Sequence, residues 1–215
     1  PEELAARYAE QCGGIAMPGW EPERMAKVQE TISEYDAIDQ EQYWDNAAYF
    51  IDAVIPHAEA LGIKMAIHPD DPPVPIFGLP RLINSAGSIR RFLALHPSPC
   101  HGITLCTGSL GADPCNNIPA IIRENAGRIH FAHIRNLKHL KGGDFYESAH
   151  PTACGSLDMY DIVKALFDTG FDGYIRPDHG RMIWGEKGRP GYGLYDRALG
   201  AAYLTGLWEA LSRGR

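Results

Sequence analysis

The sequence predicts an α/β protein of the parallel (β/α) barrel type, incomplete, with about four βα units preceded by N-terminal helices. Two observations predict this. Short β-rich runs alternate four times with segments of helical apolar spacing between residues 63 and 211, an order that implies right-handed crossovers and parallel strands. A closed eight-stranded barrel takes about 250 residues, and the roughly sixty residues before Ile63 cannot hold four more βα units of about 30 residues each.

The elements follow in order along the chain. A helical pattern over residues 1–10, already under way at Pro1, suggests that the chain is the C-terminal part of a longer (β/α)8 barrel, with 1–215 as one domain. A long amphipathic helix is expected from about Gln40 to Leu61, because its apolar residues keep helical spacing and Gly62 stops it. The expected strands are 63–68, 102–106, 128–134 and 173–178, and the expected helices between and after them are 88–95, 118–126, 157–169 and 194–211.

Composition narrows the class of partner. The formal net charge of -7 offers no basic stripe for phosphates, so nucleic acid is not expected as a partner. The five cysteines are scattered without a CxxC pair, which favours reduced thiols in the cytoplasm over a disulfide framework or zinc ribbon. Without an apolar run long enough to span a bilayer or a signal-like start, no membrane association is expected.

Each of the four predicted strands ends in a residue that can bind a metal: His68, Cys106, His133 and Asp178. The carboxyl ends of parallel barrel strands converge on one face, so these four side chains are predicted to share one ion. Taken singly, a strand-end histidine is more often a hydrogen-bonded structural residue, and a lone cysteine a small core residue. The thiolate argues for zinc, whereas an open octahedral site suits manganese or iron.

The loops after these strands supply further candidates. Asp70 and Asp71 lie in a proline-rich loop, where they could cap, orient His68 or line the pocket. The segment CTGSLGA (106–112) could let backbone N–H groups approach an anion, a weak signal. Arg135 could clamp a substrate carboxylate, although an arginine at a strand end is as often a structural ion pair.

An acid–base pair is expected near the last strand. His179 directly follows Asp178, at the edge of the predicted metal site, where a proton-transfer group belongs. Tyr192, or alternatively Tyr195, precedes or opens the last helix and could transfer a second proton. A packed aromatic ring with a hydrogen-bonded hydroxyl is the alternative for both tyrosines.

Five long motifs resemble mannonate dehydratases, in order from about Met17 to the C-terminus. They are MAIHPDDPPVPIFGLPR, LCTGSLGA, IHFAHIRN, GYIRPDHGRMIWGE and PGYGLYDRALGAAYLTGLWEAL. The resemblance implies a TIM-type barrel related to xylose isomerase-like folds and a manganese-type divalent cofactor (Mn2+, with Fe2+ and Zn2+ as alternatives). It also implies conversion of D-mannonate to 2-keto-3-deoxy-D-gluconate in hexuronate breakdown.

Residue by residue, the family's metal ligands fall on His68, Cys106, His133 and Asp178, and its proton-transfer pair falls on His179 and a tyrosine best matched by Tyr192. The expected partner is a small sugar acid, and the expected state is a homo-oligomer, either a dimer or a tetramer. Members of the family are longer and begin with barrel strands that this sequence lacks, so turnover by this chain alone is not implied.

Three rival functions stay open at this point. Sugar isomerases or epimerases and metal-dependent endonucleases use similar barrels. The acidic net charge counts against a nuclease, and the cysteine counts against an isomerase, for which a carboxylate-dominated metal site is expected. A truncated, inactive half-barrel that pairs its edge strands with another copy is the non-enzymatic alternative.

Overall fold

A computed structural model describes residues 27, 32–35, 38–76 and 78–214. The helix predicted over residues 1–10, the start of the family resemblance and Cys12 lie outside these ranges. None of the helices within them is long and apolar enough to cross a membrane.

The centre of the molecule is the predicted parallel sheet. Its strands are β1 (Met65–Ile67), β2 (His101–Cys106), β3 (Ile129–His133) and β6 (Tyr174–Arg176). They are ordered β1-β2-β3-β6, and every neighbouring pair is parallel. Within the described residues, the α/β class and the four parallel strands of the predicted sheet are therefore confirmed, although most of these strands are shorter than predicted.

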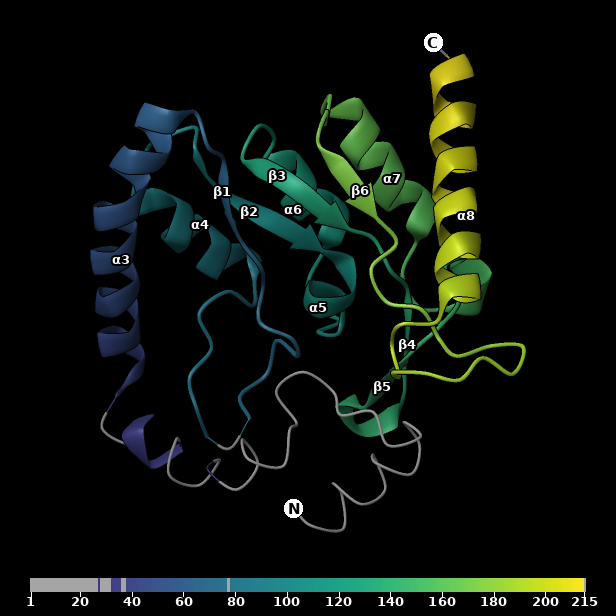
Figure 1. The fold of residues 1–215 in the computed structure, drawn as a ribbon, viewed down its shortest axis with the longest axis horizontal. Coiled ribbons are helices and arrows are strands. Elements are labelled where there is room, and N and C mark those ends of the chain that lie inside the picture. The colour runs from purple at the N-terminus through teal and green to yellow at the C-terminus, as the bar shows by residue number, and fades with distance from the viewer. Residues whose placement is uncertain (1–26, 28–31, 36–37, 77, 215) are drawn as a thin grey trace.

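Helices cover one face of the sheet and both of its sides (Figure 1). All of them except the last begin where a polar side chain caps the backbone, as when Asp39 accepts a hydrogen bond from Gln42 N and Ser85 and Ser88 form a capping box. Gly62 ends the first of them in the left-handed conformation (φ 66°). The helices are α3 (Gln40–Leu61), α4 (Ala86–Ala94), α6 (Ile118–Glu124), α7 (Met159–Asp168) and α8 (Leu194–Arg213).

Several elements were not predicted. A short helix, α5 (Thr107–Gly111), directly follows β2, and an antiparallel hairpin forms from β4 (Leu137–His139) and β5 (Phe145–Glu147). Two 3-10 turns, Lys141–Gly143 and Thr152–Cys154, lie within and after the hairpin. The hairpin lies beyond the carboxyl end of the sheet (Figure 1), so residues of the β3–α7 connection can reach the ends of the strands.

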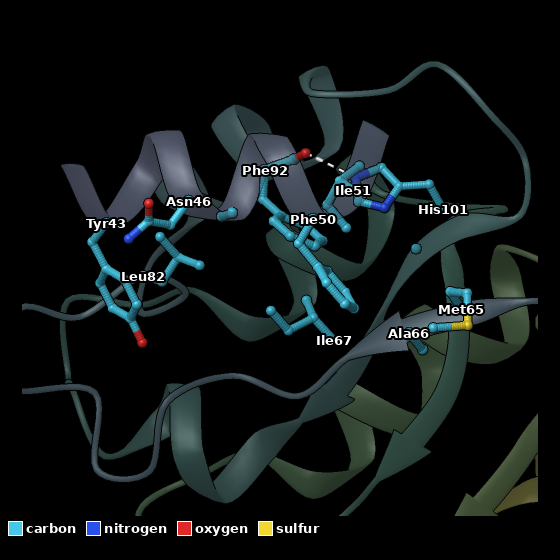
Figure 2. A pocket seen from close by; sticks show the side chains of 12 residues that line it. Tyr43, Asn46, Phe50, Ile51, Met65, Ala66, Ile67, Leu82, Phe92 and His101 are labelled. Carbon is cyan, nitrogen blue, oxygen red and sulfur yellow. Dashed lines mark hydrogen bonds between the residues drawn. The ribbon is translucent and has the colours of Figure 1, made fainter. Parts of the chain in front are cut away.

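The sheet is not closed in the part of the chain that is described, because β1 and β6 each pair on one side only. Next to β1, an apolar groove of about 370 Å³ lies between that strand and α3 (Figure 2). Its lining includes Tyr43, Phe50, Ile51, Ile67 and Phe92. A second groove, of about 310 Å³, lies between β6 and α8. Both sides of the open sheet thus present apolar hollows between an edge strand and its flanking helix.

Candidate metal and acid–base site

The ends of three adjacent strands bring three potential metal ligands together. His68 follows β1, Cys106 ends β2 and His133 ends β3. One ligand atom from each side chain lies within 4.8 Å of the other two, and His68 Nε2 is 3.2 Å from His133 Nδ1. Cys106 is the register partner of His133, so both side chains leave the same face of the sheet. We call this group the His–Cys–His cluster.

Asp178, the fourth predicted ligand, borders the cluster from the loop after β6. Its Oδ1 lies 3.3 Å from His133 Nδ1, and its Oδ2 lies 3.7 Å from Cys106 Sγ. The residue is only 4% exposed and has a positive φ of 59°. Aspartate is among the few non-glycine residues that adopt this conformation, and such strain is concentrated at functional sites.

Cys106 is fully buried, yet its surroundings favour the thiolate. Burial raises the pKa of the thiol, but hydrogen bonds to His133 and His68 and the charge of Arg135 outweigh it and bring the pKa to about 6. Cys106 also caps α5, because Sγ accepts hydrogen bonds from Ser109 N at 3.4 Å and Ser109 Oγ at 3.1 Å. Donors at a helix N-terminus stabilise a thiolate.

This arrangement corrects the expectation for CTGSLGA. Residues 107–111 form a buried helical turn rather than an open loop. The N–H group of Ser109 is directed at the Cys106 sulfur. The segment therefore supports a predicted metal ligand and does not offer its backbone to an external anion.

The donor set fits a divalent cation. His68 Nδ1 lies 2.7 Å from the Pro69 carbonyl oxygen, a contact in which Nδ1 donates its proton and Nε2 keeps a lone pair. Nε2 faces His133 at 3.2 Å, so that lone pair is directed into the cluster, and a backbone carbonyl on the outer nitrogen is typical of metal-binding histidines. Burial lowers the pKa of His68, but Cys106 and the Pro69 carbonyl raise it overall. A thiolate, two imidazoles and a carboxylate together suit a transition-metal ion.

Arg135 is buried at the centre of an ion-pair network. Its guanidinium contacts three carboxylates: Asp71 through Nη2, Glu147 through Nη1 at 2.5 Å, and Asp178 through Nε at 2.9 Å. Burial lowers the pKa of Arg135, but Cys106 and these acids raise it overall. A Cβ on Gly108 would lie 2.2 Å from Arg135 Nε, so the glycine makes room for the side chain. The geometry favours the structural ion pair over a free clamp for a substrate carboxylate.

His179 lies beside the cluster and is held by an acid that the sequence did not indicate. Its Nδ1 hydrogen-bonds Glu147 Oε1, and its Nε2 is 3.9 Å from Asp178 Oδ1. The hydrogen bond that His179 donates to Glu147 raises the pKa of His179, against an opposing effect of burial. Its side chain is 36% exposed, so a small molecule could reach the ring. Glu147 carries no motif or spacing signal, because it belongs to the unpredicted hairpin.

The two tyrosines lie farther from the cluster. Tyr192 bridges by its backbone to Gly180, the residue after His179, and its ring is 5.7 Å from the Arg189 guanidinium. Among the described residues, the Tyr192 side chain contacts none of the predicted metal ligands. Tyr195 packs on Trp184 with ring centroids 5.4 Å apart. Both tyrosines are substantially exposed, Tyr192 at 43% and Tyr195 at 51%.

Asp70 and two histidines of the β3–α7 connection have hydrogen-bond partners within the protein. Asp70 accepts hydrogen bonds from Leu82 N and Ile83 N, both at 2.7 Å, and so closes the proline-rich loop. His139 bonds the Gly111 carbonyl oxygen, and His150 bonds the Pro177 carbonyl oxygen just before Asp178. Asp70 therefore has the capping role, one of the three roles considered for it.

Comparison with known proteins gives consistent results. A family model for D-mannonate dehydratase (UxuA) matches residues 1–215. A mannonate dehydratase of Thermotoga neapolitana is 56% identical over 215 residues, which are 99% of this chain and 60% of that protein. A mannonate dehydratase of Lactococcus lactis subsp. cremoris is 54% identical, over 100% of this chain and 61% of that protein. The chain thus spans about 60% of the length of these relatives.

Solved structures agree with the fold and the family. The crystal structure of mannonate dehydratase from Streptococcus suis serotype 2 superposes with a TM-score of 0.80 and 49% identity, over 83% of this chain and 52% of that one. A D-tagatose 3-epimerase-like protein and an L-ribulose 3-epimerase superpose with TM-scores of 0.58 and 0.55 at 16% and 17% identity, a likeness of fold alone. With a family match over its whole length and relatives above half identity, this chain belongs to the D-mannonate dehydratase family.

Proposed function

We propose that this chain is the metal-binding, C-terminal portion of a mannonate dehydratase, a hydro-lyase that converts D-mannonate to 2-keto-3-deoxy-D-gluconate in hexuronate breakdown. The observation that supports this most directly is the meeting of His68, Cys106 and His133 at the carboxyl ends of three strands, with their ligand atoms within 4.8 Å of one another. Active sites of parallel barrels are built at that end. The family match over 1–215 supports the reaction.

The cation would be held by the His–Cys–His cluster and Asp178, and we propose Mn2+, with Fe2+ and Zn2+ as alternatives. When bound, a divalent cation stabilises the negative charge that develops next to a carboxylate when the neighbouring carbon loses its proton. The protein prepares for a cation because the thiolate of Cys106 and the carboxylate of Asp178 are buried side by side, 3.7 Å apart. Arg135, whose Nε lies 2.9 Å from Asp178 Oδ2, offsets part of this negative charge, and a bound cation would offset more of it.

The chain's own residues would move two protons. Elimination of water from a 2,3-dihydroxy acid removes the C2 proton and protonates the departing C3 hydroxyl. We propose that His179 carries out one of these transfers and Tyr192 the other, with the order left open. His179 suits the role because it is half-buried, reachable and next to Asp178. Tyr192 has the weaker support, since its side chain points to Arg189 and solvent.

We further propose that the four strands are the C-terminal part of a (β/α)8 barrel and that residues 1–215 form one folding unit. The apolar grooves beside β1 and β6 support this, because a neighbouring strand–helix unit on each side would cover them. A homo-oligomer in the cytoplasm is proposed as well. The four described cysteines are all free thiols, which fits a reducing compartment.

The proposed function is tested by measuring 2-keto acid release from D-mannonate by the complete protein and by the 215-residue chain, each supplied with Mn2+. We expect turnover by the complete protein. His179→Ala should lower it by about 10²–10⁴-fold while metal content stays at the wild-type level. Wild-type turnover by the variant would remove His179 from the mechanism, and no turnover of D-mannonate by the metal-loaded complete protein would contradict the proposed reaction.

A further inference from the structure

We infer that Glu147 is a positioning residue that fixes the tautomer and ring orientation of His179. One oxygen, Glu147 Oε1, accepts a hydrogen bond from His179 Nδ1 and another, at 2.5 Å, from Arg135 Nη1. Two donors on a single oxygen leave the carboxylate little freedom to rotate. Glu147 thereby connects the acid–base candidate with the buried arginine of the ion-pair network.

The hairpin holds Glu147 in place from the backbone side. Glu147 is the last residue of β5 and the register partner of Leu137, which is completely buried at the start of β4. The next residue, Ser148, donates its N–H group to the Asn136 carbonyl oxygen at 3.2 Å. The carboxylate therefore reaches His179 from a paired strand end and not from a free loop, and a rigid support of this kind is what a positioning role requires.

The contact determines which ring nitrogen is free. A carboxylate only accepts, so His179 Nδ1 must carry the proton in this hydrogen bond. In the neutral ring, Nε2 then has the lone pair. That nitrogen lies on the side of Asp178, 3.9 Å from its Oδ1, at the border of the cluster. The opposite tautomer would place its lone pair against Glu147 and its N–H toward the cluster, so Glu147 selects the form that can accept a proton there.

Asp71 provides a matched comparison. It contacts the same arginine through Nη2, and its side chain is 31% exposed against 27% for Glu147. The contacts recorded for Asp71 do not include His179. Removing either acid deprives Arg135 of one of its three carboxylates, but only removal of Glu147 frees the imidazole. Effects on Arg135 and effects on His179 can therefore be separated with two substitutions.

The first test measures the tautomer directly by long-range 1H–15N correlation spectra of protein labelled with 15N-histidine, at a pH where the ring of His179 is neutral. The chain has nine histidines, and His179→Gln identifies the resonance by its loss. We expect Nδ1 protonated and Nε2 unprotonated in the wild type and in Asp71→Asn. In Glu147→Ala we expect a shift toward the Nε2-protonated form or a mixture.

The wild-type spectrum alone can overturn the inference, which protects the test if Glu147→Ala folds poorly. A predominantly Nε2-protonated His179 in the wild type would overturn it. So would an unchanged tautomer in folded Glu147→Ala, or the same change in Asp71→Asn. None of these results depends on turnover.

A kinetic arm rests on the proposed function. In the complete protein, Glu147→Ala should lower kcat by roughly 10–100-fold, the range known for partners that orient metal-binding histidines, with little change in KM. Glu147→Gln should recover most of it, because the amide oxygen still accepts from Nδ1. A drop confined to KM, or no recovery by glutamine, would contradict positioning. The two proposals can fail separately. If neither the wild type nor the variants turn over D-mannonate but the tautomer shifts as expected in Glu147→Ala, the proposed function is wrong and the positioning role of Glu147 is retained.

Discussion

The carboxyl end of the sheet and the groove beside β1 are built in opposite ways. At the carboxyl end, charged groups pair with one another: Arg135 is 4% exposed, and its guanidinium lies against three carboxylates. The groove is apolar, and its one histidine, His101, is bonded by Nε2 to the Phe92 carbonyl oxygen (Figure 2). The comparison shows that the candidate functional site of this chain is located by a cluster of interacting titratable side chains and not by the apolar groove.

The two regions also differ in what covers them. The ligand atoms of the cluster face one another, whereas Phe50 beside the groove is 55% exposed. The exposed ring of Phe50 lies on a helix that flanks an unpaired strand edge, where the proposed neighbouring unit of the barrel would pack.

Replacing Arg135 by Met should destabilise the protein most, because three acids lose their shared cation. Breaking a buried ion pair from one side costs about 3–5 kcal/mol, which for a chain of this size lowers Tm by roughly 10 °C. Thermal unfolding measures this. Arg91→Met is the matched change on the groove side, where the exposed Arg91 pairs with Glu41, and it should shift Tm little. Equal shifts for the two variants would remove the contrast between the regions.

Replacing Cys106 by Ala should weaken divalent-metal binding more than any change in the groove. Changes to the outer partners of ligands already cost about 10–100-fold, so loss of the thiolate itself should cost at least roughly 100-fold. Titration with Co2+ followed by absorbance measures it, since the thiolate-to-metal band should vanish as well. Cys115→Ala, at an exposed free cysteine, is the control. Wild-type affinity in Cys106→Ala would place the ion elsewhere.

The Cys106 thiolate also predicts a pH dependence of stability in the metal-free protein. The pKa of Cys106 in the folded protein is about 6 against an ordinary thiol value of 9.0, so the folded state binds fewer protons than the unfolded state between these values. The contribution of the Cys106 thiolate to the free energy of unfolding is fully present above pH 9, declines as the pH falls and is lost below pH 6. Urea unfolding across this window, in wild type and Cys106→Ser, isolates the contribution. A slope of equal size in both proteins would refute the low pKa.

Phe50→Ser should have the smallest effect in the 215-residue chain, within about 0.5 kcal/mol, because the side chain is already exposed there. In the complete protein the same change should cost about 1.5–3 kcal/mol if a neighbouring unit of the barrel buries the ring. Chemical unfolding of both lengths makes the comparison. A small effect in both would count against closure of the barrel over the groove.

The sequence predicted the elements whose signals are local and regular. The helix over Gln40–Leu61 and the sheet strands follow from hydrophobic periodicity and from residues that end an element. Because the strands are parallel, their carboxyl ends then lie at the same edge of the sheet. That is why His68, Cys106 and His133 could be placed together from residues far apart in the chain. Their predicted role as ligands was inferred from the same topology.

The parts that could not be predicted depend on short elements and on tertiary contacts. The hairpin strands have three residues each, too few to show an alternation, so Glu147 carried no signal. The five residues of α5 include two glycines, and this composition predicts a loop. In the folded protein, burial and the Cys106 cap stabilise a helical turn instead. Whether Arg135 would be free or paired depended on Asp71, Glu147 and Asp178, three acids from three separate loops or strands.

The central claim is that one divalent cation binds where the strands end. An anomalous difference map from crystals grown with Mn2+ tests it most directly. We predict a single strong peak within bonding distance of His68, Cys106, His133 and Asp178. A peak bound by other residues, or none among these four in crystals of metal-loaded protein, would contradict the account.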